Sequence, residues 1–249
     1  MSTTAQMIFW DVQHGNAAYL RTPNNKHVVF DLGIGDYSGK DERFSPLQSL
    51  RDNYGVTRLD YVVITHPHRD HIDDILRFDD FYPKVLCTPR HITDAEIMVG
   101  VQEVDRPKFL KYCELRNRFV TDVTGTADDT NMPSNFGGVS FRHFFTPHLP
   151  TTNMNNHSIL TVVEYDGLKI VIPGDNECAS LADLMKRDDF KAAVRNANIL
   201  LAPHHGRESA FHIDFVNLVN PSLTIVSDGR VCVTSATARD SQKRRGGKV

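Results

Sequence analysis

The alternation of apolar and polar positions divides the first third of the chain into short elements. Residues 7–31 contain the apolar runs MIFWDV, AAYL and HVVFD, separated by the turn formers HGN and TPNNK, and predict three strands. Residues 44–54 predict a helix, with Ser45 as its cap and Pro46 at its first position. The continuous apolar, β-branched run LDYVVI at 59–64 is typical of a strand buried on both faces.

The remaining two thirds alternate between helical and extended patterns. Apolar spacing at 92–120 predicts two helices separated at Pro107, and the polar segment 121–138 predicts a long loop, disordered or forming a mobile lid. The elements expected after it are strands near 139–145, 158–165 and 168–173, a helix at 177–195, the strand NILLAP, the helix FHIDFVNLV and the strand SLTIVSD. The turn YDGL predicts a hairpin. This order indicates one α/β domain, in which helices flank a sandwich of sheets.

Composition narrows the function classes. A chain of 249 residues can bury one substantial core, and a formal net charge of −3 provides no global basic field for nucleic acid or an anionic membrane. The basic terminal run RDSQKRRGGKV reads as a solvated tail, with a phosphate-contacting tail as the alternative. No apolar run approaches the ~20 residues of a membrane span. Scattered cysteines without a signal peptide lead us to expect reduced thiols and a cytoplasmic location.

The segment THPHRDH places three histidines and an aspartate directly after the predicted buried strand. His66 and His68 are two residues apart, so both imidazoles point the same way in extended backbone and can bind one ion. Asp70 and His71 are consecutive and diverge, so they can form half of a second site. Imidazole and carboxylate ligands suit zinc, manganese or iron. A histidine-rich surface loop or a proton-relay cluster is the alternative.

Candidates for the missing ligands follow other predicted strands. Asp175 in IVIPGDNE could bridge two ions, or could cap a helix that begins at Glu177. His204 and His205 in LLAPHHG could be ligands or a pair of surface histidines. Asp31 ends the run HVVFD and could touch a metal or orient one of its ligands. Because sites in α/β sheets assemble at the carboxyl ends of strands, we expect these residues to converge.

Together these segments resemble the metallo-β-lactamase-fold hydrolases, through VVFDLG, THPHRDH, IPGDNE and PHHG. DVQHGNA and NNHSIL are similar to one branch of that family, the hydrolase domain of DNA-uptake competence channel proteins. The resemblance covers about residues 7–230. It implies a four-layer αββα sandwich, an α/β fold, as a single domain over 1–249. The chain would depart from the branch in a helical insertion at about 92–120 and in an atypical or truncated C-terminal end at about 228–249.

The resemblance also implies two divalent metal ions, zinc or manganese, at one edge of the sandwich. The implied ligands are His66 and His68 for the first ion, Asp70, His71 and His205 for the second, and Asp175 as the bridge. His204 would then face the substrate or support a ligand, and the reverse assignment of His204 and His205 stays open because adjacent side chains diverge.

The third histidine of the first site is the position that the resemblance leaves open. His157 in NNHSIL is the leading candidate, followed by His148 and by Asn153 or Asn155. An ordinary loop histidine is the alternative for His157. His14 in DVQHGN lies outside the matched ligand motifs and could sit near the site.

The implied chemistry is hydrolysis by a bridging hydroxide, which two adjacent ions make available near neutral pH. Asp70 and Asp175 would orient the hydroxide, and His204 could protonate the leaving group. Family analogy supplies the substrate class, a phosphodiester in nucleic acid or a nucleotide, so the protein would be a phosphodiesterase or nuclease. Arg207 and Arg230 are candidate phosphate contacts.

Two other functions compete with this hypothesis. The same centre could hydrolyse carboxylic ester, thioester or lactam bonds. The open third-histidine position and the unusual C-terminal end also allow a non-catalytic subunit of a multi-protein assembly, which would bind a protein partner or form a homodimer.

Overall fold

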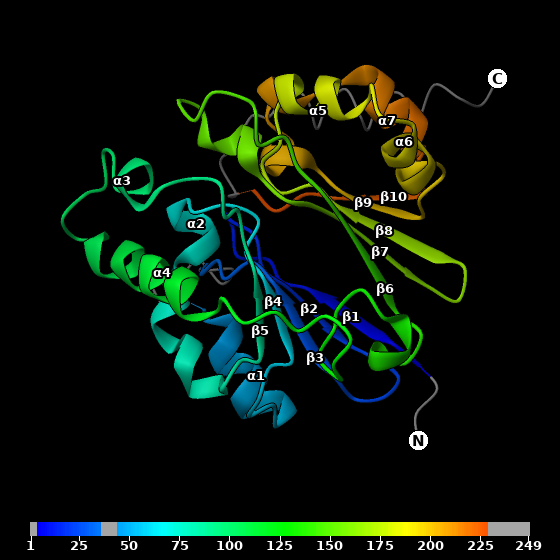
Figure 1. Cartoon of the computed structure of the whole chain (residues 1–249). Helices are drawn as coiled ribbons and strands as arrows, with labels where there is room; N and C mark the ends of the chain where they lie inside the picture. The colour runs from blue at the N-terminus through cyan, green and yellow to red at the C-terminus, as the bar shows by residue number, and fades with distance from the viewer. Residues whose placement is uncertain (1–3, 36–43, 229–249) are drawn as a thin grey trace.

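Two five-stranded sheets stack face to face in the centre of the computed structural model, which describes residues 4–35 and 44–228 (Figure 1). The first sheet has the order β1 (Gln6–Phe9), β2 (Ala18–Arg21), β3 (His27–Phe30), β4 (Tyr61–Val63) and β5 (Val85–Cys87). The second has the order β10 (Leu223–Ile225), β9 (Ile199–Leu201), β8 (Leu168–Ile172), β7 (Leu160–Tyr165) and β6 (Ser140–Phe144). The strands β3, β4 and β5 are parallel to one another, and so are β8, β9 and β10.

Helices cover the outer face of each sheet. The helices on the side of the first sheet are α1 (Pro46–Tyr54), α2 (Arg69–Ile72), the 3-10 helix η1 (Ile75–Phe81) and α4 (Arg106–Arg118), with the short α3 (Asp94–Ile97) beyond them. Those over the second sheet are α5 (Cys178–Leu184), α6 (Asp188–Val194) and α7 (Ile213–Val219). The four-layer αββα sandwich predicted from the sequence is thereby confirmed. Among the residues described, no helix is long and apolar enough to cross a membrane.

Several strands are apolar on both faces because each sheet packs between its partner sheet and a layer of helices. In β4, Tyr61 and Val63 belong to the apolar cluster between the sheets, whereas Val62 belongs to the cluster under the helices of the first sheet. Val162 and Val163 divide in the same way in the second sheet. This double burial explains the continuous apolar run that predicted β4.

Local signals in the sequence mark helix and turn positions correctly. The Ser45 hydroxyl accepts a hydrogen bond from the backbone N–H of Gln48 at 3.0 Å and caps α1, which ends at the left-handed Gly55. Asp166 and Gly167 both have positive φ, as a two-residue hairpin turn requires. These predictions are confirmed.

The predicted helix at 177–195 is two helices. α5 and α6 are separated around Met185 to Arg187, where Arg187 adopts extended backbone with φ −89° and ψ 127°. Leu184 and Phe190, on either side of this break, are both fully buried in the cluster against the second sheet. Because of this break, each of the two short helices directs apolar side chains at the second sheet.

The long loop predicted at 121–138, disordered or forming a mobile lid, is a loop but does not cover the carboxyl ends of β3 and β4. This segment packs against the turn between β2 and β3, at the ends of the strands opposite to the carboxyl ends of β3 and β4. The Asn24 amide donates to the backbone carbonyl of Asn135 at 2.9 Å, and Lys26 and Lys84 both pair with Asp128. From residue 229 on, the predicted atypical C-terminal end lies outside the described residues.

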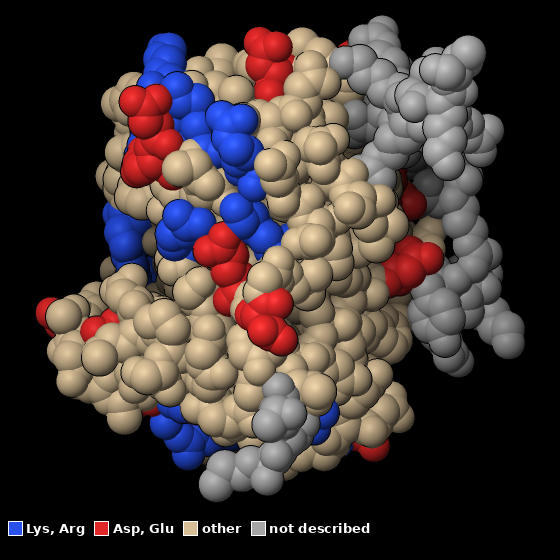
Figure 2. All heavy atoms as spheres, turned by 90° about the vertical axis from the view of Figure 1, so that its right-hand side faces the viewer, with Lys and Arg blue, Asp and Glu red and all other residues tan. Residues whose placement is uncertain are grey.

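Surface charge is mixed on the face that Figure 2 shows. Basic and acidic side chains lie next to one another there rather than in separate fields. This agrees with the small formal net charge of −3. A face of this kind supplies no uniformly basic surface for a nucleic-acid backbone.

Candidate metal centre

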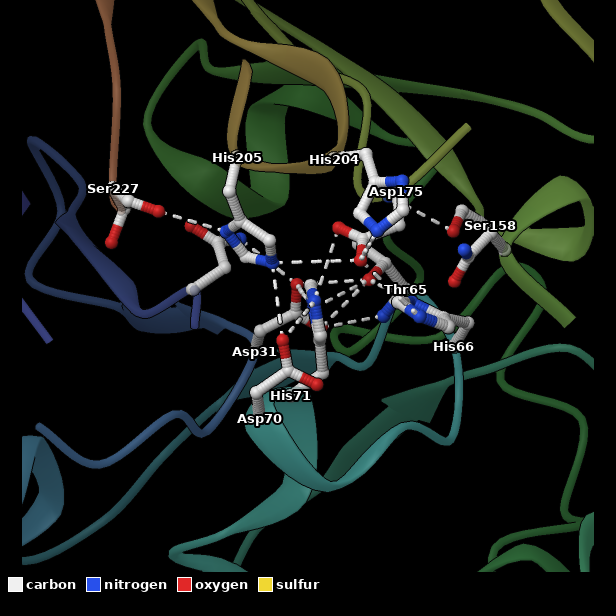
Figure 3. A network of polar contacts seen from close by, with 12 residues as sticks. Asp31, Thr65, His66, Asp70, His71, Ser158, Asp175, His204, His205 and Ser227 are labelled. Atoms are coloured by element: carbon white, nitrogen blue, oxygen red, sulfur yellow. Dashed lines mark hydrogen bonds and ion pairs between the residues drawn. The ribbon is translucent and has the colours of Figure 1, made fainter. Parts of the chain in front are cut away.

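The predicted ligands other than His157 converge at one edge of the sandwich, where loops leave the carboxyl ends of β3, β4, β8 and β9 (Figure 3). Parallel pairing of β3 with β4 and of β8 with β9 brings the four ends together. The loop after β4 carries His66 and His68 and runs into α2, which carries Asp70 and His71. The segments after β8 and β9 face this loop and contribute the remaining side chains.

One group of donors contains Asp70, His71, Asp175 and His205. One ligand atom from each lies within 4.8 Å of the others. His205 Nε2 is 3.1 Å from Asp70 Oδ2, and His71 Nε2 is 3.1 Å from Asp175 Oδ1. All but Asp70 are buried. These distances place two imidazoles and two carboxylates around one small volume.

A second group contains His66, His68 and Asp175, again with one ligand atom of each within 4.8 Å of the others. His66 Nε2 is 3.7 Å from Asp175 Oδ2, the oxygen that also lies 3.5 Å from His205 Nε2. Asp175 thus belongs to both groups. A carboxylate in that position can bridge two ions.

Hydrogen bonds behind the ligands fix how their rings point. His71 Nδ1 lies 2.8 Å from Asp31 Oδ2, and His205 Nδ1 lies 2.9 Å from the backbone carbonyl of Ser227. With each Nδ1 engaged, each Nε2 faces the centre. Asp31 also accepts hydrogen bonds from the backbone N–H and hydroxyl of Thr65, and belongs to neither donor group. Of the two roles predicted for Asp31, its position corresponds to orienting a ligand.

Close backbone contacts position the metal loop. The backbone N–H of Asn16, in DVQHGNA, donates to the carbonyl of Asp70, and that of Leu32 donates to the carbonyl of His71. A Cβ on Gly33 would lie 2.7 Å from the Asp70 carbonyl oxygen, so only glycine fits there. The segments DVQHGNA and VVFDLG therefore hold the backbone of α2 in place.

The centre carries an excess of negative charge. Burial alone would lower the pKa of His71, but the carboxylates of Asp175 and Asp31 raise it well above its usual value. Burial likewise opposes protonation of His205, yet Asp175, with Asp70, raises its pKa to about 9. Carboxylates that raise the pKa of buried imidazoles in this way would equally stabilise a divalent cation bound between them.

The donor set fits metal ions in a second respect. His66 Nε2 is buried and has no hydrogen-bond partner. A buried polar atom without a partner is costly, and coordination to an ion would satisfy this nitrogen. Imidazole with carboxylate oxygen is a ligand combination that zinc and manganese accept.

Comparison with known proteins matches residues 10–210, more than half of the chain, to the Metallo-beta-lactamase superfamily. The chain belongs to this superfamily. A UPF0173 metal-dependent hydrolase of Saccharolobus solfataricus is 30% identical over 83 residues, which are 33% of each chain. The chain thus matches about a third of the length of that curated relative.

Solved structures share the superfamily fold. The metallo hydrolase Igni18 of Ignicoccus hospitalis aligns with a TM-score of 0.57 and 14% identity, over 97% of this chain and 91% of its own. The E377D mutant of the β-hydroxylase CmlA, an enzyme of Streptomyces venezuelae, aligns with a TM-score of 0.56 and 14% identity, over 98% and 52%. At this identity the likeness concerns the fold alone. The narrower similarity to competence channel proteins stays a prediction.

Within this superfamily fold, the two adjacent histidines of PHHG point apart. Both have left-handed backbone, with φ 46° at His204 and 53° at His205, and only His205 belongs to a donor group. His204 Nδ1 lies 3.1 Å from Glu177 Oε1, and its Nε2 lies 3.8 Å from Asp175 Oδ2. No sequence pattern indicates this contact, because Glu177 is predicted only as the start of a helix.

The position of the third histidine remains a prediction. His157 is fully buried with its Nδ1 2.8 Å from His91 Nε2, and it belongs to neither donor group of the described residues. Its Nε2 has no hydrogen-bond partner, and neither does the buried Oδ1 of Asn155, whose amide donates to Glu177 at 3.1 Å. His148 is exposed and pairs with Asp183 instead.

A histidine and an arginine border the group that contains Asp70. His14 Nε2 is 3.6 Å from Asp70 Oδ2, and the His14 ring centre is 4.6 Å from that of His205. Arg207 Nη2 lies 3.3 Å from His14 Nδ1. The structure therefore places His14 and Arg207 at the rim of the centre, whereas Arg230 lies outside the described residues.

Proposed function

We propose that this protein is a metal-dependent hydrolase that uses two divalent ions, zinc or manganese. The observation that carries the proposal is the membership of Asp175 in two adjacent donor groups. His66 and His68 would hold one ion, and Asp70, His71 and His205 the other, with Asp175 between them. Once bound, the ions would provide Lewis acidity and hydroxide at neutral pH.

The chain's own residues would orient and move protons around this centre. Asp70 and Asp175 would orient the attacking nucleophile by accepting a hydrogen bond from it. The carboxylate of Glu177 holds Nδ1 of His204, so Nε2 faces the centre and can donate a proton to the leaving group. We therefore assign His204 as the general acid and Glu177 as the residue that positions it.

The bond we propose is a phosphodiester, in nucleic acid or a nucleotide. Two features support this choice: the similarity of DVQHGNA and NNHSIL to the competence branch, and the position of His14 and Arg207 beside the second donor group. Arg207 Nη2 lies 3.6 Å from Asp228 Oδ1, and a guanidinium has further N–H groups that can bind a nonbridging phosphate oxygen. A phosphate held there would lie next to Asp70 and His205.

Hydrolysis of a carboxylic ester, thioester or lactam is the second candidate. Acyl substrates carry no charge at the reacting carbonyl and are commonly bound by apolar side chains. Apolar side chains border the first donor group next to His68, which favours this candidate on that side of the centre.

The test loads the purified protein with Mn²⁺ or Zn²⁺, measures bound metal, and assays bis-p-nitrophenyl phosphate, DNA, RNA, cyclic nucleotides and p-nitrophenyl acetate. We expect about two ions per chain and phosphodiester cleavage. Asp175→Asn should lose metal and lower kcat about 100-fold or more, while Asp166→Asn, in an exposed hairpin turn, should change neither.

Two outcomes would contradict the proposal. Cleavage of the acyl substrate alone would overturn the phosphodiester assignment and favour the second candidate. A protein that binds two ions and cleaves none of these substrates is not the hydrolase proposed here.

A further inference from the structure

A cleft of about 560 Å³ opens beside His68, on the side of the first donor group. Its base includes Pro67 and His68, so it is continuous with the metal loop. One wall comes from 96–101 and from Phe109 of α4, and the other from 151–154, the loop that leads into η3 (Met154–His157). The volume is in the range of about 300–1,000 Å³ typical of ligand pockets.

Apolar side chains from both walls line this cleft. They are Ile97, Val99, Val101, Phe109 and Met154. Val99 is 79% exposed, so its side chain has apolar surface that a bound group could cover. In the region of α3, drawn beyond the helices of the first sheet in Figure 1, the insertion thus builds an apolar wall next to the centre.

The side chains that line the cleft do not suit a phosphate group in addition to the one proposed at the donor groups. No lysine or arginine is among the described residues that line it. Its single carboxylate, Glu96, accepts hydrogen bonds from the backbone N–H and hydroxyl of Thr93 at 2.8 and 2.7 Å, and from the Thr151 hydroxyl at 2.6 Å. Glu96 therefore stabilises the wall, and the cleft presents no cation to a phosphate backbone.

Basic side chains near the metal loop are engaged elsewhere. Arg69 Nη1 lies 3.9 Å from Asp105 Oδ2, and Lys108 pairs with both Asp73 and Asp105. These acidic partners neutralise the cations on α2 and α4. Arg207 is paired as well, with its Nη2 3.6 Å from Asp228 Oδ1. The two sides of the centre therefore differ in the apolar side chains that border the first donor group.

We propose that this cleft binds an uncharged apolar substituent, alkyl or aryl, of the substrate. The inference rests on the proposed function and specifies its substrate: an ester whose reacting group lies at the donor groups and whose apolar arm extends past His68 between α3 and residues 151–154. Within the proposed phosphodiesters, this description narrows the substrate to a small diester and excludes nucleic acid, which carries a phosphate at every unit.

Two measurements on the Mn²⁺-loaded protein test the inference. One compares binding of methylphosphonate and hexylphosphonate by calorimetry, and the other compares kcat/KM for the p-nitrophenyl diesters of methyl and hexyl phosphate and for thymidine 5′-p-nitrophenyl phosphate. Burying five additional methylenes predicts that the hexyl compounds bind and react about tenfold better or more. A larger gain for the thymidine ester than for the hexyl diester would show that the cleft prefers a polar nucleoside to an apolar group, and would overturn the inference.

Val99 and Val104 provide a matched pair of variants. Both valines lie in the helical insertion and are 79% and 80% exposed, but only Val99 lines the cleft. Val99→Asp should reduce the ratio of hexyl to methyl affinity to near one, because a charge at the wall opposes burial of the chain. Val104→Asp should leave the ratio unchanged.

The outcomes separate this inference from the proposed function. Equal affinity for both phosphonates, in a protein that cleaves phosphodiesters, would overturn the inference alone. Tighter hexylphosphonate binding without cleavage of any diester would support the cleft and overturn the phosphodiester assignment. If Val99→Asp and Val104→Asp reduced the ratio of hexyl to methyl affinity equally, the inference would also be contradicted.

Discussion

Asp31 acts on the centre from behind a ligand. It is fully buried, has a left-handed φ of 57°, and its carboxylate contacts Thr65, Asn16 and His71. A non-glycine residue in that backbone region costs free energy and is retained where surrounding contacts require it. Here the contacts hold the loop after β4 and set the proton of His71 on Nδ1, which leaves Nε2 for a metal.

We predict that Asp31→Asn weakens metal binding about 10- to 100-fold. An asparagine amide that donates to His71 Nδ1 would move the ring proton to Nε2 and block coordination. Mn²⁺ or Zn²⁺ affinity is measured by competition with a chelating dye. Asp60→Asn is the control, because Asp60 is also buried and accepts from the backbone N–H of His27, away from the centre. Equal affinity in both variants would refute the role assigned to Asp31.

At the residue scale, the sequence predicts ligands whose geometry is local. His66 and His68 share a direction because they are two residues apart, and that relation survives folding. Glu177 and Asn155 are different, because each matters only through side chains that β7, β8 and β9 bring together. The sequence spacing of His157 and Asn155 does not say which of them turns toward the centre, so the third-ligand prediction stays untested.

At the scale of elements, strands that are buried on both faces can be recognised in the sequence as apolar runs. β4 stands out as an unbroken apolar run and β8 ends in one, IVI at residues 170–172, and their carboxyl ends locate the centre. The break between α5 and α6 left no comparable signal, because Met185 to Arg187 contain neither glycine nor proline. The segment 121–138 looks like a free loop only because its partners, Asn24 and Lys84, are distant in sequence.

The turn after β8 depends on Gly174, which has φ 58°. A Cβ there would lie 2.8 Å from Thr65 Cβ and 3.0 Å from Ser158 Cβ. We predict that Gly174→Ala lowers the free energy of unfolding by about 2–4 kcal/mol, the sum of left-handed strain and overpacking. Gly167→Ala, with φ 79° and no atom within 4 Å, should cost only the strain, about 1 kcal/mol.

Urea unfolding in the presence of a chelator measures both glycine variants without a contribution from bound metal. Because Asp175 follows Gly174, Gly174→Ala should also lower metal affinity, which Gly167→Ala should not. If Gly174→Ala and Gly167→Ala lowered the free energy of unfolding equally, the close approach of the β8 turn to the loop after β4 would not be the reason that position 174 requires glycine.

At the scale of the whole molecule, the centre exists only while the two sheets keep their relative position. One sheet supplies His66, His68, Asp70 and His71, and the other supplies Asp175 and His205. His143 on β6 is one polar link between the sheets: its Nε2 is 2.7 Å from the Tyr61 hydroxyl on β4, and its Nδ1 is 3.0 Å from the Thr161 hydroxyl on β7.

Burial between the sheets lowers the pKa of His143 to about 4, against an ordinary value of 6.5. Between pH 6.5 and 4 the unfolded chain therefore binds a proton that the folded protein does not, so stability falls as the pH falls through this window. Across this window the free energy of unfolding should fall by about 3 kcal/mol. With chelator present, His143→Gln should show a shallower decline in unfolding free energy, whereas His148→Gln, at an exposed site, should follow the parent protein. Parallel pH profiles for all three proteins would mean that this histidine does not couple the sandwich to pH.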